Sequence, residues 1–244
     1  MQRVSLPLRT MAGRENNFWH KLHSITGIIP IGYYLIQHLA LNSFTIAGED
    51  KFNGVIAFFE GLPFHVLLVL QIFVLLIPIL FHSIYGLFIT SRAEMNYSGK
   101  YRWSENLMFN WQRWTGIILF IGIIVHVATT SINSKINGVE VIQYAAWQEK
   151  LTSYFYLPLV LYMIFVAAAC YHLSYGIWNF CIRWGITVSD KAQAGIKKFS
   201  AGTFVLLVLM GWGALFGFLI HKPKGAAPEV APPAVSASYA PESR

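Results

Sequence analysis

Four histidines lie inside long uncharged stretches of this sequence: His38, His82, His126 and His172. The first two are 44 residues apart and the last two 46, so the spacing nearly repeats. An ionisable side chain at membrane depth is expensive, and it marks a functional site by default. Neutral imidazole nitrogens are common metal ligands and bind the iron of heme. The four histidines are therefore candidate metal ligands.

The two halves of the chain repeat each other around these histidines. Residues 81–86 read FHSIYG and residues 171–176 read YHLSYG, while TGII occurs at 26–29 and again at 115–118. Repetition at a fixed period indicates one supersecondary unit used twice. The unit here is a helical hairpin that carries two histidines.

Five uncharged runs must position the histidines. A composition that is 55% hydrophobic and 12% charged excludes an ordinary soluble domain. Each run reaches the roughly 20 residues that cross a hydrocarbon core, and a helix satisfies its own backbone there. We therefore predict an all-α integral membrane protein with a four-helix bundle and a fifth, peripheral helix without histidine. The runs cover residues 22–48, 61–91, 114–133, 151–182 and 199–220.

The chain is expected to divide into a basic leader (1–19), the membrane domain (20–221) and a Pro/Ala-rich disordered tail (222–244). Outer loops are expected around Glu49 to Glu60 and at 133–150. Pro78 should bend the second helix just ahead of His82. The helices themselves are expected at 21–42, 63–91, 111–132, 151–184 and 199–220.

Basic residues predict the orientation of the chain. Twelve lie at the N-terminus and in the second and fourth connections, and six lie on the opposite side. Because cytoplasmic loops are enriched in Lys and Arg, the N-terminus is expected inside and the C-terminus outside. This excess accounts for most of the net charge of +7, so no nucleic-acid partner is expected.

Depth along the helices sorts the histidines into two levels. At 1.5 Å per residue, His82 and His172 lie about 14 and 18 Å from the inner helix ends, and His126 and His38 about 22 and 27 Å. The two-fold axis of a parallel duplication makes the same pairs. A histidine that only hydrogen-bonds a neighbouring helix would predict neither pairing nor symmetry. The sequence thus predicts two bis-histidine hemes b, an inner one on His82 and His172 and an outer one on His38 and His126.

Other residues are expected to line the hemes. Three glycines lie one helical turn from a ligand and lack a Cβ where a flat porphyrin must approach: Gly86, Gly122 and Gly176. Heme propionates need cationic or hydrogen-bonding partners, for which the inner interface offers Lys21, Ser24, Arg113 and Trp114.

The position of a quinone stays open at this point. His23 lies about 22 Å from His38 along the first helix, so it is expected at neither ligand level. With Ser24 it could hydrogen-bond a propionate or the carbonyl of a quinone at an inner site. Glu60, at the outer mouth of the second helix, could handle a proton for an outer quinone site. Solvation at an interface would explain these residues as well.

The chain resembles the diheme cytochrome b membrane-anchor subunit of succinate dehydrogenase, in its single-anchor, five-helix form. The likeness covers about residues 16–220, and the tail falls outside it. It rests on LHSITG at 22–27, IQHL at 36–39, LPF at 62–64, HSIYG at 82–86, RWTG at 113–116, His126, His172 with Gly176 and Trp178, and WGIT at 184–187.

The resemblance implies a non-catalytic heme and quinone subunit in a bacterial cytoplasmic membrane. Its partners would be a flavoprotein and an iron–sulfur subunit on the inner face, and its quinone is expected to be menaquinone. Electrons from succinate would pass through iron–sulfur clusters, the inner heme and the outer heme to quinone. The sequence has no Gly-rich dinucleotide fingerprint and no cysteine cluster, which agrees with flavin and iron–sulfur chemistry in partner subunits.

Three alternatives remain at the level of sequence. The subunit could serve a quinol:fumarate reductase, because direction depends on redox potentials. It could be another bis-histidine cytochrome b, such as the anchor of a hydrogenase or nitrate reductase. It could also be a heme-free helical scaffold or transporter whose histidines carry protons.

Overall fold

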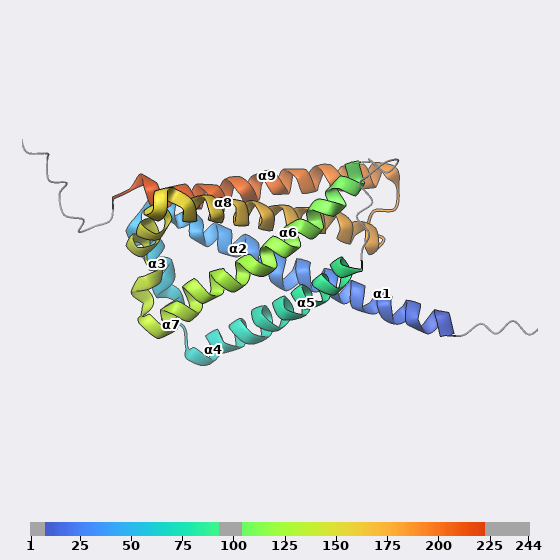
Figure 1. The fold of residues 1–244 in the computed structure, drawn as a ribbon, viewed down its shortest axis with the longest axis horizontal. Coiled ribbons are helices and arrows are strands. Elements are labelled where there is room, and N and C mark those ends of the chain that lie inside the picture. The colour runs from blue at the N-terminus through green and yellow to red at the C-terminus, as the bar shows by residue number, and fades with distance from the viewer. Residues whose placement is uncertain (1–7, 93–103, 223–244) are drawn as a thin grey trace, which may run out of the picture.

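The computed structural model describes residues 8–92 and 104–222. Within these residues, five helices are long and apolar enough to cross a membrane. α1 begins at one end of the bundle and α9 ends at the other (Figure 1). The predicted all-α membrane fold with five spans is confirmed. The spans cover Asn17–Ala47, Phe64–Ser91, Ser104–Asn137, Tyr144–Arg183 and Asp190–Ile220.

The first span is a helix with a widened turn in its middle. α1 (Leu8–Thr26) continues through a π-helical stretch, Gly27–Gly32, into α2 (Tyr33–Asn42) and a 3-10 turn, Ser43–Ala47. Pro30 lies inside the π-helical stretch, where a wider turn accommodates a residue without an N–H.

The helix begins at Leu8, much earlier than the expected Lys21, because no proline interrupts the chain between these two residues. The leader is thus helical from Leu8 on. Residues 1–7 of the leader and the tail beyond residue 222 lie outside the described part of the chain.

A helix also takes the place of the first expected outer loop. α3 (Glu49–Glu60) starts directly after Gly48, whose φ of 93° makes the sharp turn that glycine tolerates. Acidic side chains in the first turn of α3 interact favourably with the helix dipole. The polar residues that suggested a loop therefore form the exposed side of an amphipathic helix, and Phe52 on its other side is buried.

The second span departs from regular α-helix just before Pro78, the residue that predicts a bend. α4 (Phe64–Val69) leads into a π-helical stretch, Leu70–Leu76, and then into α5 (Ile77–Ser91). Pro78 lies in the first turn of α5, so the wide turn directly precedes it. This arrangement leaves His82 in a regular helix.

The second hairpin has a structured outer connection in place of the loop expected at 133–150. α6 (Ser104–Val127) continues through π-helical Ala128–Ile132 into α7 (Asn133–Asn137), a 3-10 turn (Val139–Ile142) and α8 (Tyr144–Arg183). α8 is broken at Ser153–Tyr156, where the last three residues adopt φ of 47°, 56° and 63°. Its membrane helix therefore starts after Tyr156, close to the expected start at Leu151.

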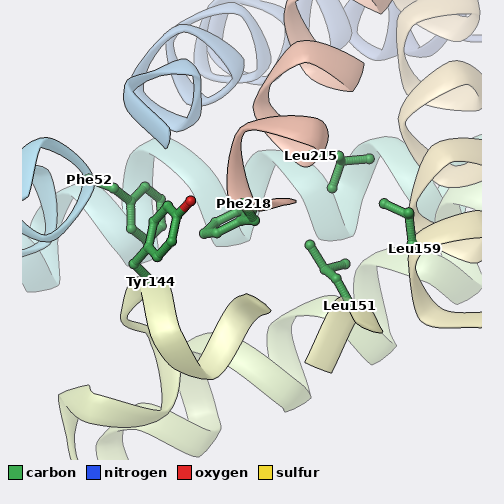
Figure 2. Packing of buried hydrophobic residues seen from close by; sticks show 6 residues of the cluster. All are labelled: Phe52, Tyr144, Leu151, Leu159, Leu215 and Phe218. Carbon is green, nitrogen blue, oxygen red and sulfur yellow. The ribbon is translucent and has the colours of Figure 1, made fainter. Parts of the chain in front are cut away.

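α9 (Asp190–Ile220) carries the largest buried share of the five spans, and the span formed by α4 and α5 carries the smallest. α9 runs beside α8 along one edge of the bundle, and α4 and α5 lie along the opposite edge (Figure 1). One core lies at the end of the bundle where α3 packs. Figure 2 shows its six buried residues, Phe52, Tyr144, Leu151, Leu159, Leu215 and Phe218.

Candidate functional site

The four membrane histidines meet in two pairs inside the bundle. The inner pair is His82 on α5 with His172 on α8, whose ring centroids are 6.1 Å apart at an interplanar angle of 82°. The outer pair is His38 on α2 with His126 on α6, at 5.9 Å and 82°. The two pairs have nearly the same geometry, as expected if the two levels are copies of one arrangement.

Both histidines of the inner pair are held by backbone carbonyls of the preceding span. His82 Nδ1 lies 2.9 Å from the carbonyl oxygen of His23, and His172 Nδ1 lies 3.1 Å from that of Gln112. Since a carbonyl oxygen only accepts, each Nδ1 carries the hydrogen and each Nε2 keeps its lone pair. A metal-ligating histidine is held in this way, its second nitrogen donating to a carbonyl or carboxylate.

The repeated Thr-Gly dipeptides explain how these rings reach the backbone. A Cβ on Gly27 would overlap Cε1 of His82, and one on Gly116 would lie 3.2 Å from Cε1 of His172. Thr115 adds a contact of 3.3 Å from its Oγ1 to His172 Nδ1. Gly27 and Gly116 were visible in the sequence as part of the repeat, but nothing in the pattern assigned them a role.

The outer pair has side-chain neighbours in place of carbonyl partners. His126 Nδ1 lies 3.4 Å from the hydroxyl oxygen of Tyr162 on α8. Tyr34 stacks on His38, one helical turn away, at a centroid distance of 5.4 Å. Tyr162 was missed in the sequence, because its contact joins the two helices of the second hairpin across 36 residues and no motif marks it.

The glycines expected to face a porphyrin lie close to side chains of neighbouring helices, and their role at a heme stays a prediction. A Cβ on Gly86 would lie 3.1 Å from Cε1 of His23, and one on Gly176 would lie 3.8 Å from Nε2 of Gln112. A Cβ on Gly122 would overlap the ring of Phe165. The missing Cβ atoms thus allow close helix packing around the pairs, which the spacing from the ligands alone could not reveal.

The expected placement of His23 is wrong. Its ring stacks on His82, with centroids 4.0 Å apart and an angle of 12°, so it lies at the level of the inner pair. The depth argument took Lys21 as the helix start, but α1 begins at Leu8 and His23 is an interior residue.

The residues expected to hold propionates lie on two helices, Lys21 and Ser24 on α1 and Arg113 and Trp114 on α6. Lys21 lies over the ring of Trp184 at 5.1 Å, and Trp184 Nε1 donates to Ser24 Oγ at 3.0 Å. Arg113 is buried, with its guanidinium 3.7 Å from the ring centre of Phe109. Trp114 is 49% exposed, which places its ring on the outside of α6, away from the buried Thr115 that follows it.

Glu60, the candidate for an outer quinone site, is the last residue of α3 and is exposed. Its carboxylate is in solvent reach at the end of the bundle that holds α3 and α7 (Figure 1). Among the residues that the structure describes, Glu60 makes no hydrogen bond or ion pair with His38 or His126, and its role as a proton carrier stays a prediction.

The residues present fit a bis-histidine heme at each level. A metal–imidazole bond is about 2 Å long and a ring centre lies roughly 1 Å further on, so two rings across one metal ion are roughly 6 Å apart. Both pairs have this separation. Buried polar atoms without a hydrogen-bond partner in the described structure, Nδ1 of His23 and Oε1 of Gln112, lie beside the inner pair. Such atoms are expected where a polar group completes the site.

Comparison with known proteins shows what this chain is similar to. The family model of the succinate dehydrogenase/fumarate reductase transmembrane subunit matches residues 91–211, which include His126 and His172. The succinate dehydrogenase cytochrome b558 subunit of Bacillus subtilis (strain 168) is 36% identical over 211 residues. The alignment covers 86% of this chain and 100% of that relative.

Proposed function

The chain belongs to the succinate dehydrogenase cytochrome b membrane subunits, and we propose that it binds two hemes b within its four-helix repeat. His82 and His172 would ligate the inner iron, and His38 and His126 the outer iron. The observation that carries the proposal is the matched geometry of the two pairs: a centroid separation of about 6 Å and an angle of 82° in both. The Bacillus subtilis relative is a succinate dehydrogenase cytochrome b558 subunit, which supports heme b as the cofactor.

The residues of this chain select the ligand nitrogen and exclude water. At the inner level the carbonyls of His23 and Gln112 hold Nδ1 as a donor, so that Nε2 is the atom that can bind iron. The spans supply an apolar surrounding, which tunes the potential of a bound heme. When bound, the hemes would supply one-electron transfer between the partner subunits and a membrane quinone.

We place the partners at the end of the bundle where α1 begins and where α8 connects to α9. This end carries the basic excess in the sequence, and it corresponds to the cytoplasmic side under the positive-inside rule. A flavoprotein and an iron–sulfur subunit would dock there, and this chain would take no direct part in succinate chemistry. Menaquinone is the expected quinone, in the cytoplasmic membrane of a bacterium.

The proposal is tested by heme quantification and redox titration of the purified complex, with single histidine variants. The wild-type complex should contain two hemes b that titrate separately. His82→Ala and His172→Ala should each remove the inner heme. His38→Ala and His126→Ala should each remove the outer heme. His65→Ala, at an exposed position of α4, should retain both. Loss of the same heme in variants from different pairs would refute the ligand assignment.

The family description also includes fumarate reductase, so the opposite direction of catalysis is the second candidate. The same redox titration separates succinate oxidation from fumarate reduction. Heme potentials at or below that of the native quinone favour succinate oxidation, because electrons then pass from heme to quinone. Heme potentials above that of the quinone let quinol reduce the hemes and favour fumarate reduction.

A further inference from the structure

The two helices of the first hairpin carry nearly the same five residues, HSITG at 23–27 and HSIYG at 82–86. In the structure each histidine lies against the glycine of the other helix. The His82 ring contacts the Gly27 position, and the His23 ring lies 3.1 Å from where a Cβ of Gly86 would be. This packing brings the imidazoles of His23 and His82 face to face, with ring centroids 4.0 Å apart and planes within 12° of parallel.

The second hairpin has the same arrangement with one difference. His172 lies against Gly116, and Gln112 lies beside Gly176. Gln112 thus takes the place of His23, four residues before the glycine of the Thr-Gly dipeptide. It has no ring to stack, and its Nε2 donates 3.0 Å to the backbone carbonyl of His172.

The backbone contacts cannot distinguish the two inner histidines, because each Nδ1 donates to an equivalent carbonyl. The side chains do distinguish them. A histidine bound to iron can rotate about the iron–nitrogen bond, and one hydrogen bond at Nδ1 leaves part of that freedom. The parallel ring of His23, stacked at van der Waals distance, removes that freedom on one face of His82.

We propose that His23 is a positioning residue for the inner heme: its ring fixes the plane of the His82 imidazole and thereby the electronic state of that iron. The inference rests on the proposed role of His82 and His172 as ligands. The angle between the two ligand planes governs the g-values of a low-spin ferric heme. His23 therefore maintains the 82° angle of the inner pair, and replacing its ring changes the spectrum and potential of one heme only.

The test uses the complete complex with three variants. His23→Gln inserts the residue that the second hairpin has at this place, and it leaves the backbone carbonyl available to His82. His23→Phe keeps an aromatic plane without the ring nitrogens. His20→Gln is the matched control. The His20 ring packs against Tyr85, with ring centroids 5.6 Å apart, and does not stack on His82. The measurements are heme per complex, the low-temperature EPR spectrum of the oxidised hemes and a redox titration. The EPR signal that persists in His82→Ala identifies the outer heme.

His23→Gln should retain two hemes, with a shifted EPR g-maximum and midpoint potential for the inner heme and unchanged values for the outer one. His23→Phe and His20→Gln should keep the wild-type signals. If His23→Gln does not assemble, His23→Asn, which also lacks a ring to stack on His82, takes its place in the comparison with His23→Phe.

Unchanged inner-heme signals in His23→Gln would overturn the proposal, and so would equal shifts in His23→Gln and His23→Phe. Loss of a heme in His23→Phe would mean that His23 itself ligates iron. These outcomes are distinct from failure of the proposed function, which would appear as fewer than two hemes in the wild-type complex.

Discussion

Substitution of Gly27 by alanine tests the inner site most directly. A Cβ at this position would overlap Cε1 of His82 and lie 2.9 Å from its Nδ1. The imidazole must therefore move away from α1, and its 2.9 Å contact with the carbonyl of His23 must lengthen. The substitution thus pushes a candidate ligand out of its place without changing its chemistry.

The expected effect on heme binding follows from the crowding. Overpacking a tight site costs about 1–3 kcal/mol, which corresponds to a loss of heme affinity of about 5- to 150-fold. Loss of a ligand-orienting hydrogen bond has a similar effect, about 10- to 100-fold in metal affinity. The intrinsic preference of helices for alanine over glycine acts in the opposite direction, by about 1 kcal/mol, and acts on stability. Gly116→Ala should be milder, because its Cβ would lie 3.2 Å from His172 and a shift of a few tenths of an ångström relieves it.

The assay is the heme content of the purified complex by pyridine hemochrome spectra, with a redox titration to identify the heme that is lost. Gly27→Ala should lose the inner heme partly or fully and keep the outer one. Gly202→Ala on α9, where nothing lies within 4 Å of the added Cβ, is the control and should keep both. Two wild-type hemes in Gly27→Ala would refute the close approach of His82 to α1, and with it the inner-site geometry.

Three further substitutions probe other parts of the molecule. Tyr162→Phe removes the hydroxyl next to the outer pair, and it should change the potential of the outer heme alone, as measured in the same titration. Thr45→Val removes the 2.7 Å hydrogen bond from a buried hydroxyl to the carbonyl of Ala214, so the complex should lose about 0.5–1.5 kcal/mol of stability, seen as a lower thermal midpoint in detergent. Glu105→Gln removes the ion pair with Lys197 at the half-exposed ends of α6 and α9, and it should cost no more than about 1 kcal/mol, a difference that vanishes at high salt.

The number of spans and the residues of the two pairs could be predicted from the sequence because membrane helices are governed by simple constraints. An uncharged run of sufficient length must be helical, and a duplicated hairpin must place its histidines at matched levels. The structure brings His82 next to His172 and His38 next to His126, as the repeat indicates. Whether they bind iron stays a prediction.

What the sequence did not provide depends on contacts between helices. The charged residues of α3 suggested a loop. The helix buries Phe52 in the core shown in Figure 2, and the sequence alone did not reveal this contact. The depth of His23 in the membrane could not be derived from its own helix. It was counted from an assumed helix start at Lys21, whereas α1 begins at Leu8. The sequence assigned the glycines next to the histidines to a cofactor surface, which stays a prediction, but it did not show that Gly86 and Gly122 also accommodate side chains of neighbouring helices.

The burial of α9, a helix without a candidate ligand, follows from the way in which the two hairpins are joined. Side chains from both hairpins donate to carbonyls near the C-terminal end of α9: Thr45 to Ala214, Tyr144 to Gly217 and Gln148 to Phe218, each at 2.7 Å. The last four carbonyls of a helix have no partner within the helix, so the bonds to Gly217 and Phe218 satisfy groups that would otherwise need water, while Thr45 adds a second donor to the carbonyl of Ala214. Each histidine pair takes one residue from each hairpin, and its spacing therefore depends on how the hairpins are held relative to each other. The fifth helix thus contributes to the geometry of both pairs by fixing the hairpins at the end of the bundle where α3 lies.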